Sequence, residues 1–336
     1  METGRAIIAK ALRGCIAAAV LAFAVGASAT PLPLPACPAA TRPPAVASTA
    51  PVVRAAVIDD CLTVHGEEMA ARALDTRLSI EVEVNGSGPY RFLLDSGADR
   101  SVIGAALARR LNLPASDIVH LNDVAGVLDV PTFLVDTLRI GDASTFAVSA
   151  PALPEQYLGA QGIVGVDALA DRRIMMDFQT NTIALEDART PETIEPGEIV
   201  VVGHRRHGQL ILTEVRVGKL NVYAVIDTGS DTTIGNLALL QKVAGSRFPP
   251  TRVAMILNSV TGRTATATGM ILPHIRIGQL QINDLPVAFA DVAPFAIFGL
   301  ADRPAMLLGT DALKGLKRMS LDFHQYRVRF QLRDRD

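Results

Sequence analysis

One short motif occurs twice in this chain, and it limits the folds that the chain can adopt. The first copy, Phe92 to Asp99, reads FLLDSGAD, and the second, Ala224 to Asp231, reads AVIDTGSD. Each copy is an apolar run followed by Asp, then Ser or Thr, then Gly. Such a run is typical of a buried strand, and glycine suits a tight turn. The motif therefore predicts two strands that each deliver an aspartate to a turn. Two matching turns suggest one shared catalytic centre.

The similarity between the two halves continues beyond the motif. A helical apolar pattern follows each copy, over Ala105 to Leu113 and over Asn236 to Ala244. Two later pairs of segments also match: GIVGVDAL at 162–169 with MLLGTDAL at 306–313, and IMMDF at 174–178 with MSLDF at 319–323. Because these landmarks recur in the same order, we interpret the chain as a duplicated framework with approximate internal twofold symmetry.

The length of 336 residues exceeds that of a typical single domain and favours two similar domains with terminal segments. Ordered structure is expected to begin near Arg77, where apolar and polar residues start to alternate. A segment rich in proline and acidic residues between the halves suits a linker. We therefore expect a signal peptide at 1–29, a Pro/Ala-rich tether and N-terminal segment at 30–75, a first lobe at 76–186, a linker at 187–198 and a second lobe at 199–333.

Composition argues against several classes of function. The formal net charge is −2, so nucleic acid and anionic surfaces are not expected partners. Tryptophan is absent and aromatic residues make up only 4% of the chain, which disfavours recognition by aromatic stacking. Histidine and cysteine do not occur at zinc-binding spacings, so we expect neither a metal nor another cofactor.

The N-terminus has the pattern of an export signal. Three basic residues precede an apolar stretch from Cys15 to Val25, and Ala27-Ser28-Ala29 provides a small-residue cleavage site. The mature protein is then expected to be periplasmic or secreted, starting near Thr30. An uncleaved N-terminal membrane anchor is the alternative, although the apolar stretch is shorter than a membrane span needs.

These motifs resemble those of the aspartic peptidases, particularly the retropepsin-like group, and the resemblance covers both halves. In that family an apolar-apolar-Gly segment supports the Asp turn, as Ile163-Val164-Gly165 and Leu307-Leu308-Gly309 would here. The resemblance implies a mainly β fold with two β-barrel lobes, short helices and a pseudo-twofold axis. Two lobes in one chain match the pepsin-like arrangement and predict a monomer with an internal pseudo-dimer. Pairing of each half with a second chain is the alternative.

The resemblance assigns catalysis to Asp95 and Asp227. Two carboxyl groups held close together cannot both ionise readily, so the pair shares one proton and provides one acid and one base. The ionised group would activate a water molecule for attack on a peptide carbonyl, without a covalent intermediate.

The residues that follow each aspartate are also assigned roles by the resemblance. Ser96 and Thr228 are expected to hydrogen-bond across the lobe interface, while Gly97 and Gly229 allow the tight turns and present N–H groups. The remaining turn residues are expected to bind substrate: Asp99, Asp231, Ala98 and Ser230.

Two features of retroviral proteases have no obvious counterpart in this sequence. The flaps, which are hairpins that cover the active site, have only weak candidates at Val124–Val127 and Val260–Arg263. No arginine follows the supporting glycines. Asp167 and Asp311 lie two residues after them, and we interpret these aspartates as helix or turn caps. An ion pair between the lobes would have to be built differently.

The same motifs are also compatible with a function of a different class. An isolated Asp-Thr-Gly or Asp-Ser-Gly is usually only a turn, and a duplicated β-barrel could bind extended peptides or a protein partner without catalysis. The duplication and the presence of both aspartates favour the enzyme. The sequence therefore predicts an aspartic endopeptidase that acts on peptide or protein substrates.

Overall fold

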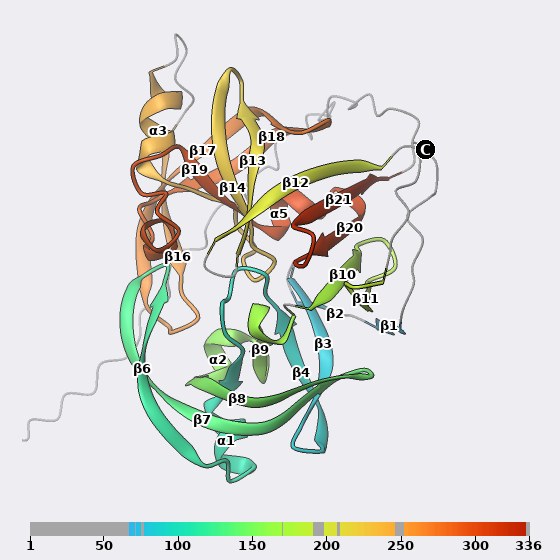
Figure 1. Ribbon diagram of the computed structural model, residues 1–336. Coiled ribbons are helices and arrows are strands. Elements are labelled where there is room, and N and C mark those ends of the chain that lie inside the picture. The colour runs from blue at the N-terminus through green and yellow to red at the C-terminus, as the bar shows by residue number, and fades with distance from the viewer. Residues whose placement is uncertain are drawn as a thin grey trace, which may run out of the picture. The chain divides into compact units, whose positions relative to one another are not determined.

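A computed structural model describes residues 67–70, 72–74, 77–169, 171–190, 198–206, 209–245 and 252–333. The predicted signal peptide and nearly all of the predicted tether lie outside these residues, as does most of the predicted linker. The described part is mainly β, which confirms the fold class (Figure 1). None of its helices is long and apolar enough to cross a membrane.

The two halves contain corresponding elements in the same order. The first half contains β1 (Glu67–Ala70), β2 (Arg72–Leu74), β3 (Arg77–Val84), β4 (Ser87–Leu94), β5 (Val102–Gly104), α1 (Ala105–Arg110), β6 (Ala115–Asp123), β7 (Gly126–Ile140), β8 (Ala143–Leu153), α2 (Glu155–Leu158), β9 (Gly162–Val164), the 3-10 helix η1 (Val166–Ala168), β10 (Arg172–Asp177) and β11 (Thr182–Asp187). The second half contains β12 (Ile199–Arg206), β13 (Gln209–Val217), β14 (Leu220–Ile226), β15 (Ile234–Gly235), α3 (Leu237–Ala244), β16 (Val253–Asn258), β17 (Thr264–Ile277), β18 (Leu280–Phe289), α4 (Ala293–Ile297), β19 (Ala305–Leu308), α5 (Thr310–Leu313), β20 (Leu316–Asp322) and β21 (Arg327–Leu332).

Strand order is also the same in the two lobes. The first lobe has the order β2-β3-β4-β9-β5-β8-β7-β6, and an extra pairing between β3 and β7 closes the sheet on itself. The second lobe has the order β12-β13-β14-β19-β15-β18-β17-β16, with the corresponding extra pairing between β13 and β17. This arrangement places β4 and β14, the strands that precede the two aspartates, inside their sheets.

The lobes are joined by a shared sheet with the order β1-β11-β10-β20-β21-β12. Its centre is the antiparallel pair β10 and β20, one strand from each half. Strands β1 and β2 begin this structure before Arg77, earlier than the sequence pattern predicted. β1 pairs with β11 far along the chain, a contact that apolar alternation within a short segment does not reveal, whereas β2 forms a local hairpin with β3.

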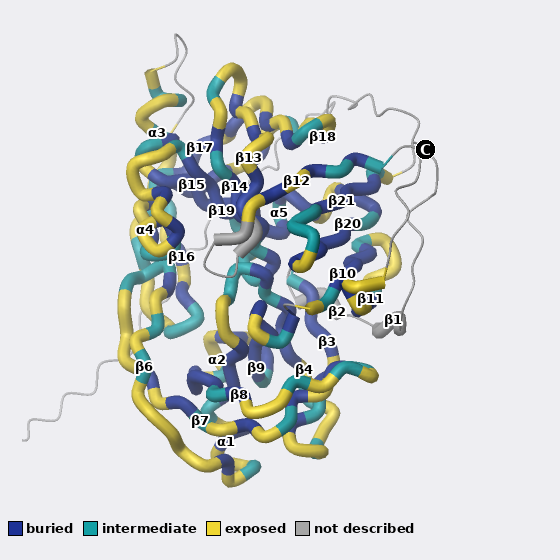
Figure 2. Tube along the Cα trace, viewed as in Figure 1, coloured by how far each residue is buried: buried dark blue, intermediate teal, exposed yellow. Residues whose placement is uncertain are grey.

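Burial follows the expected pattern near the two motifs. The residues Phe92, Leu93 and Leu94 are each 1% exposed, and the second run, Ala224–Ile226, is equally buried. Figure 2 shows buried central strands and more exposed outer strands such as β6. The helix predicted over Asn236 to Ala244 is observed as α3. It begins after Asn236 because the side chain of this residue caps it, accepting the N–H of Leu239 at 2.9 Å.

Candidate active site

The aspartates lie where two parallel strand pairs end. Asp95 directly follows β4, which pairs with β9, and its N–H donates to Val164 O at 3.0 Å. Asp227 directly follows β14, which pairs with β19, and its N–H donates to Leu308 O at 2.9 Å. Each predicted supporting segment therefore holds the backbone of the aspartate next to it.

The carboxyl groups are oriented by backbone N–H groups of their own turns. Asp95 Oδ1 accepts from the N–H of Gly97 at 2.7 Å and of Ala98 at 3.1 Å. Asp227 Oδ1 accepts from the N–H of Gly229 at 3.2 Å. The shorter bonds to Asp95 stabilise a negative charge on that group more strongly.

Glycine is required in both turns by the close approach of the other lobe. A Cβ on Gly97 would lie 2.6 Å from Asp227 Oδ1, and a Cβ on Gly229 would lie 2.1 Å from Asp95 Cγ. These separations are far below van der Waals contact. Each carboxyl group thus lies against the turn of the opposite lobe, and the two motifs form one site.

Ser96 and Thr228 join the two turns reciprocally. The N–H of Ser96 donates to Thr228 Oγ1 at 2.9 Å, and the N–H of Thr228 donates to Ser96 Oγ at 3.2 Å. Ser96 Oγ also donates to Ile226 O at 2.8 Å, and Thr228 Oγ1 donates to Leu94 O at 2.9 Å. Both side chains are buried, so losing either hydroxyl would leave polar backbone groups without a partner.

The two carboxyl groups differ in proton affinity. Burial, and next the charge of Asp95, raise the pKa of Asp227 well above its ordinary value. Burial also raises the pKa of Asp95, but the N–H groups of Gly97 and Ala98, and the positive charge of Arg77, oppose that increase. These surroundings favour the neutral form of Asp227 more than that of Asp95, and the two groups titrate as a pair.

The four predicted substrate-binding residues lie in the same two turns. Asp99 and Asp231 are exposed, and Asp231 Oδ1 accepts from Thr232 Oγ1 at 3.0 Å. Ser230 Oγ donates to the Thr232 carbonyl at 2.8 Å, while Ala98 packs beside an apolar cluster. Their role in substrate binding stays a prediction.

A comparison with known protein families also links the two Asp motifs. The family model described as "Aspartyl protease" matches residues 80–168 and 213–312. The chain belongs to the aspartyl protease family. Each matched region contains one Asp turn and its supporting strand, consistent with a two-lobed, retropepsin-like arrangement. A search of curated proteins found no match.

In this member of the aspartyl protease family, Asp167 holds the loop after the first Asp turn and is not the N-cap residue of η1. Asp167 Oδ1 accepts from the N–H of Ser101 at 2.8 Å and from Ser101 Oγ at 2.7 Å. Ser101 Oγ in turn accepts from the N–H of Gly165, which is the N-cap residue of η1. Asp167 Oδ1 also accepts from the N–H of Ala168 in η1 at 2.9 Å, as expected of a residue that caps this turn. Its bonds to Ser101 are a second role, which the sequence did not reveal.

The second lobe repeats this support at Asp311, which also accepts from the N–H of Ala312 in α5 at 2.8 Å. Asp311 accepts from the N–H of Thr233 at 3.0 Å and from Thr233 Oγ1 at 2.7 Å. Thr233 Oγ1 accepts from the N–H of Gly309, the N-cap residue of α5. Burial raises the pKa of Asp311. The signal in the sequence was the recurrence, in both halves, of a hydroxyl residue after the motif and an Asp two residues after the supporting Gly.

The flap candidates form the turns of two hairpins that contact each other. Val124–Val127 lies at the turn between β6 and β7, and Val260–Arg263 lies at the turn between β16 and β17. Arg263 Nη1 donates to Val127 O at 2.9 Å, which links the two turns. We refer to these two hairpins as the flaps.

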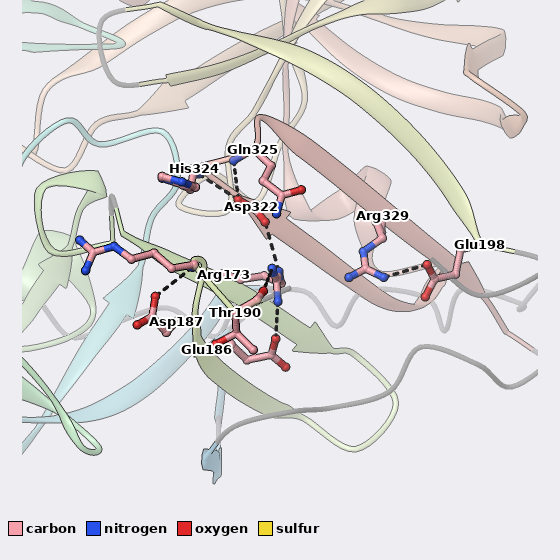
Figure 3. A network of polar contacts seen from close by, with 10 residues as sticks. Arg173, Glu186, Asp187, Thr190, Glu198, Asp322, His324, Gln325 and Arg329 are labelled. Carbon is pink, nitrogen blue, oxygen red and sulfur yellow. Dashed lines mark hydrogen bonds and ion pairs between the residues drawn. The ribbon is translucent and has the colours of Figure 1, made fainter. Parts of the chain in front are cut away.

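The lobes are also joined by reciprocal ion pairs in the shared sheet. Arg173 on β10 faces Asp322 on β20 at 3.2 Å, and Arg318 on β20 faces Asp177 on β10 at 2.5 Å. The guanidinium group of Arg173 is buried and also contacts Glu186 at 3.0 Å (Figure 3). These pairs occupy equivalent positions in the two halves. Here they connect the lobes without an arginine next to the supporting glycines.

No cluster of His, Cys, Asp and Glu that could hold a metal ion occurs in the part of the chain that the structure describes.

Proposed function

We propose that this protein is an aspartic endopeptidase that hydrolyses peptide bonds with the Asp95/Asp227 pair. The observation that carries the proposal is the position of each carboxyl group against the glycine of the opposite turn. The hydrogen bond and the electrostatic coupling between the two carboxyl groups further support one shared catalytic unit. Membership of the aspartyl protease family is consistent with this chemistry.

Unequal proton affinities assign the two roles. Ionised Asp95 would remove a proton from water, and the resulting hydroxide would attack the peptide carbonyl carbon. Protonated Asp227 would donate a hydrogen bond, and then its proton, to the carbonyl oxygen. As the C–N bond breaks, Asp95 would pass its proton to the leaving amine, and Asp227 would take a proton from one hydroxyl of the diol, which becomes the carbonyl of the product acid. The products are a carboxylic acid and an amine, and the pair again holds one proton on Asp227.

The deciding test is cleavage of a mixed peptide library by the purified chain between about pH 3 and 7.5. We expect Asp95→Asn and Asp227→Asn each to lose about a thousandfold in kcat/KM, because each removes one half of the acid–base pair. A pepstatin-type inhibitor should block the native chain. The control is Asp136→Asn on β7, an exposed residue outside the site, which should retain full activity.

The rival function is binding of extended peptides without hydrolysis. Folded native protein that binds peptides but cuts none across this pH range would favour that function. Full cleavage by either Asn variant would also contradict the proposed pair.

Two further expectations remain proposals about the whole protein. The pattern of the N-terminal residues supports export to the periplasm or secretion, with cleavage near Thr30. Because one chain supplies both halves of the pair, we infer that the monomer is active. Activity should then be proportional to protein concentration, whereas a site shared between chains would lose specific activity on dilution.

A further inference from the structure

The flaps of this chain meet through a carboxylate on one hairpin and hydroxyl groups on the other. Asp123, the last residue of β6, accepts from Ser259 Oγ and, at 2.6 Å, from Thr261 Oγ1. Its second oxygen accepts from the N–H of Ala125 at 2.7 Å, within its own turn. Asp123 is 7% exposed and Ser259 is 6% exposed, so this contact between flaps excludes most water.

The apolar residues beside these groups also cross between lobes. Val124 follows Asp123 and packs against the apolar cluster of the second lobe that includes Val225. Val260 follows Ser259 and packs against the cluster of the first lobe that includes Leu93, next to Asp95. Each flap tip therefore packs against apolar residues of the lobe opposite its own.

The helices contribute matching contacts. Tyr157 on α2 of the first lobe packs on the flap of the second: a Cβ on Gly262 would lie 2.3 Å from its ring. Reciprocally, α4 of the second lobe contacts β6 of the first. Each flap is thus contacted by a helix of the opposite lobe.

The chemistry of the contact depends on the two lobes having different sequences. Asp123-Val124 and Ser259-Val260 occupy equivalent places at the two flap tips. In a symmetric dimer of identical lobes, equivalent residues would meet, and two buried carboxylates would repel each other. With Asp on one flap and Ser on the other, an acceptor meets a donor. A charge-assisted hydrogen bond of this kind is stronger than a bond between two hydroxyl groups.

We propose that Asp123, Ser259 and Thr261 are positioning residues that form a latch between the flaps, and that the latch must break before a substrate reaches the Asp pair. The effect of the latch on substrate entry rests on the proposed function, whereas the contact between the flaps does not depend on it.

The first test measures hydrogen exchange in the full chain and needs no catalysis. In Asp123→Ala, amides of residues 119–127 and 255–263 should exchange about tenfold faster than in the native protein, since a charged hydrogen-bond contact has been lost. Amides of residues 92–98 should keep their native rates. The control is Asp129→Asn, which alters an exposed pair with His120 on the same flap and should leave exchange unchanged.

A residue exchange separates a latch from a merely structural role. Ser259→Asp alone would place two carboxylates together and should open the flaps, whereas Asp123→Ser combined with Ser259→Asp restores one acceptor and one donor. The double variant should return flap exchange towards the native rate. Thr261→Val, which preserves side-chain shape, should give a smaller acceleration and remains informative if Asp123→Ala fails to fold.

Inhibitor binding connects the latch to the active site. A pepstatin-type inhibitor should associate about tenfold faster with Asp123→Ala, while the double variant should associate at the native rate. Unchanged flap exchange in Asp123→Ala, or no recovery in the double variant, overturns the latch. If no variant binds the inhibitor or cuts peptides, the proposed function fails, and hydrogen exchange still decides whether the latch exists.

Discussion

At the scale of single residues, two nearly identical motifs produce two chemically different carboxyl groups. Gly97 N–H lies 2.7 Å from Asp95 Oδ1, whereas the equivalent distance from Gly229 to Asp227 is 3.2 Å. The surroundings of each carboxyl group, and not its residue type, therefore set which of the two has the higher tendency to hold a proton. The sequence indicated both aspartates, but it contained no reason to distinguish them.

The close approach of the turns predicts that Gly229→Ala inactivates the enzyme. The new methyl group would occupy a position 2.1 Å from Asp95 Cγ, so the turn or the carboxyl group must move. We expect kcat/KM on a cleaved peptide to fall by about a hundredfold or more, since small displacements of catalytic groups are costly. Gly315→Ala is the matched control, because its Cβ would meet no atom within 4 Å. Native activity in Gly229→Ala would show that the turns are less closely apposed.

At the scale of elements, the shared sheet decides how the two lobes are held together. Strands β10 and β20 align so that Arg173 faces Asp322 and Asp177 faces Arg318. In each strand Arg and Asp are separated by four residues, so they lie on the same face. An antiparallel partner with the same spacing therefore satisfies both ion pairs at once.

Acid should weaken this interface through Asp177. Burial favours its neutral form, but the bond from Arg318 and the N–H groups of Thr180 and Gln179 outweigh burial, so the pKa of Asp177 lies below its ordinary value of 3.8. A lowered pKa contributes stability above the ordinary value, and this contribution disappears as pH falls through the folded-state pKa. Asp177→Asn should therefore lower the free energy of unfolding by about 1–3 kcal/mol at pH 7.

Urea unfolding at pH values from about 7 to 3 measures this effect. The difference between native protein and Asp177→Asn should shrink below about pH 4. Asp171→Asn provides the control, because its pair with Arg189 is largely exposed and should contribute little. A difference that stayed constant down to pH 3 would rule out the charged pair as its source.

At the scale of the whole molecule, two lobes of different sequence bring two carboxyl groups together. The unequal surroundings of Asp95 and Asp227, and the proposed flap latch, both depend on this difference between the lobes. Because the pKa values of Asp95 and Asp227 are raised and that of Asp177 is lowered, the two kinds of group make stability change with pH in opposite directions.

Stability should reveal the raised pKa of Asp227 directly. A carboxyl group with a raised pKa contributes stability that is fully present below its ordinary value of 3.8 and is lost as pH rises through the folded-state pKa. The native protein should therefore lose stability between about pH 4 and neutral pH relative to Asp227→Asn, which cannot ionise there. Thermal unfolding of both proteins over this range checks the prediction. Parallel pH profiles would contradict a raised pKa.

The sequence by itself was sufficient for the mainly β fold and the family. The apolar runs of strand length and the turns that need glycine are local patterns, and the chain contains each of them twice. Both copies are observed in the structure, at Asp95 and at Asp227. The roles of the site residues and the lobe boundaries stay predictions. The sequence placed the start of order at Arg77 and treated Asp167 and Asp311 only as caps, so it missed the pairing of β1 with β11 and the bonds from Ser101 and Thr233. In each of these contacts the partner lies far along the chain.

Only the tertiary structure decided which distant groups meet. It paired β1 with β11, placed Ser101 on Asp167 and Thr233 on Asp311, and brought Asp123 to Ser259. The unequal pKa values of Asp95 and Asp227 were also decided by the tertiary structure, because burial and neighbouring charge arise only when the lobes pack. Local sequence determines backbone preference and the alternation of apolar residues. Desolvation, contact between lobes and hydrogen bonding across more than a hundred residues arise from the packed fold.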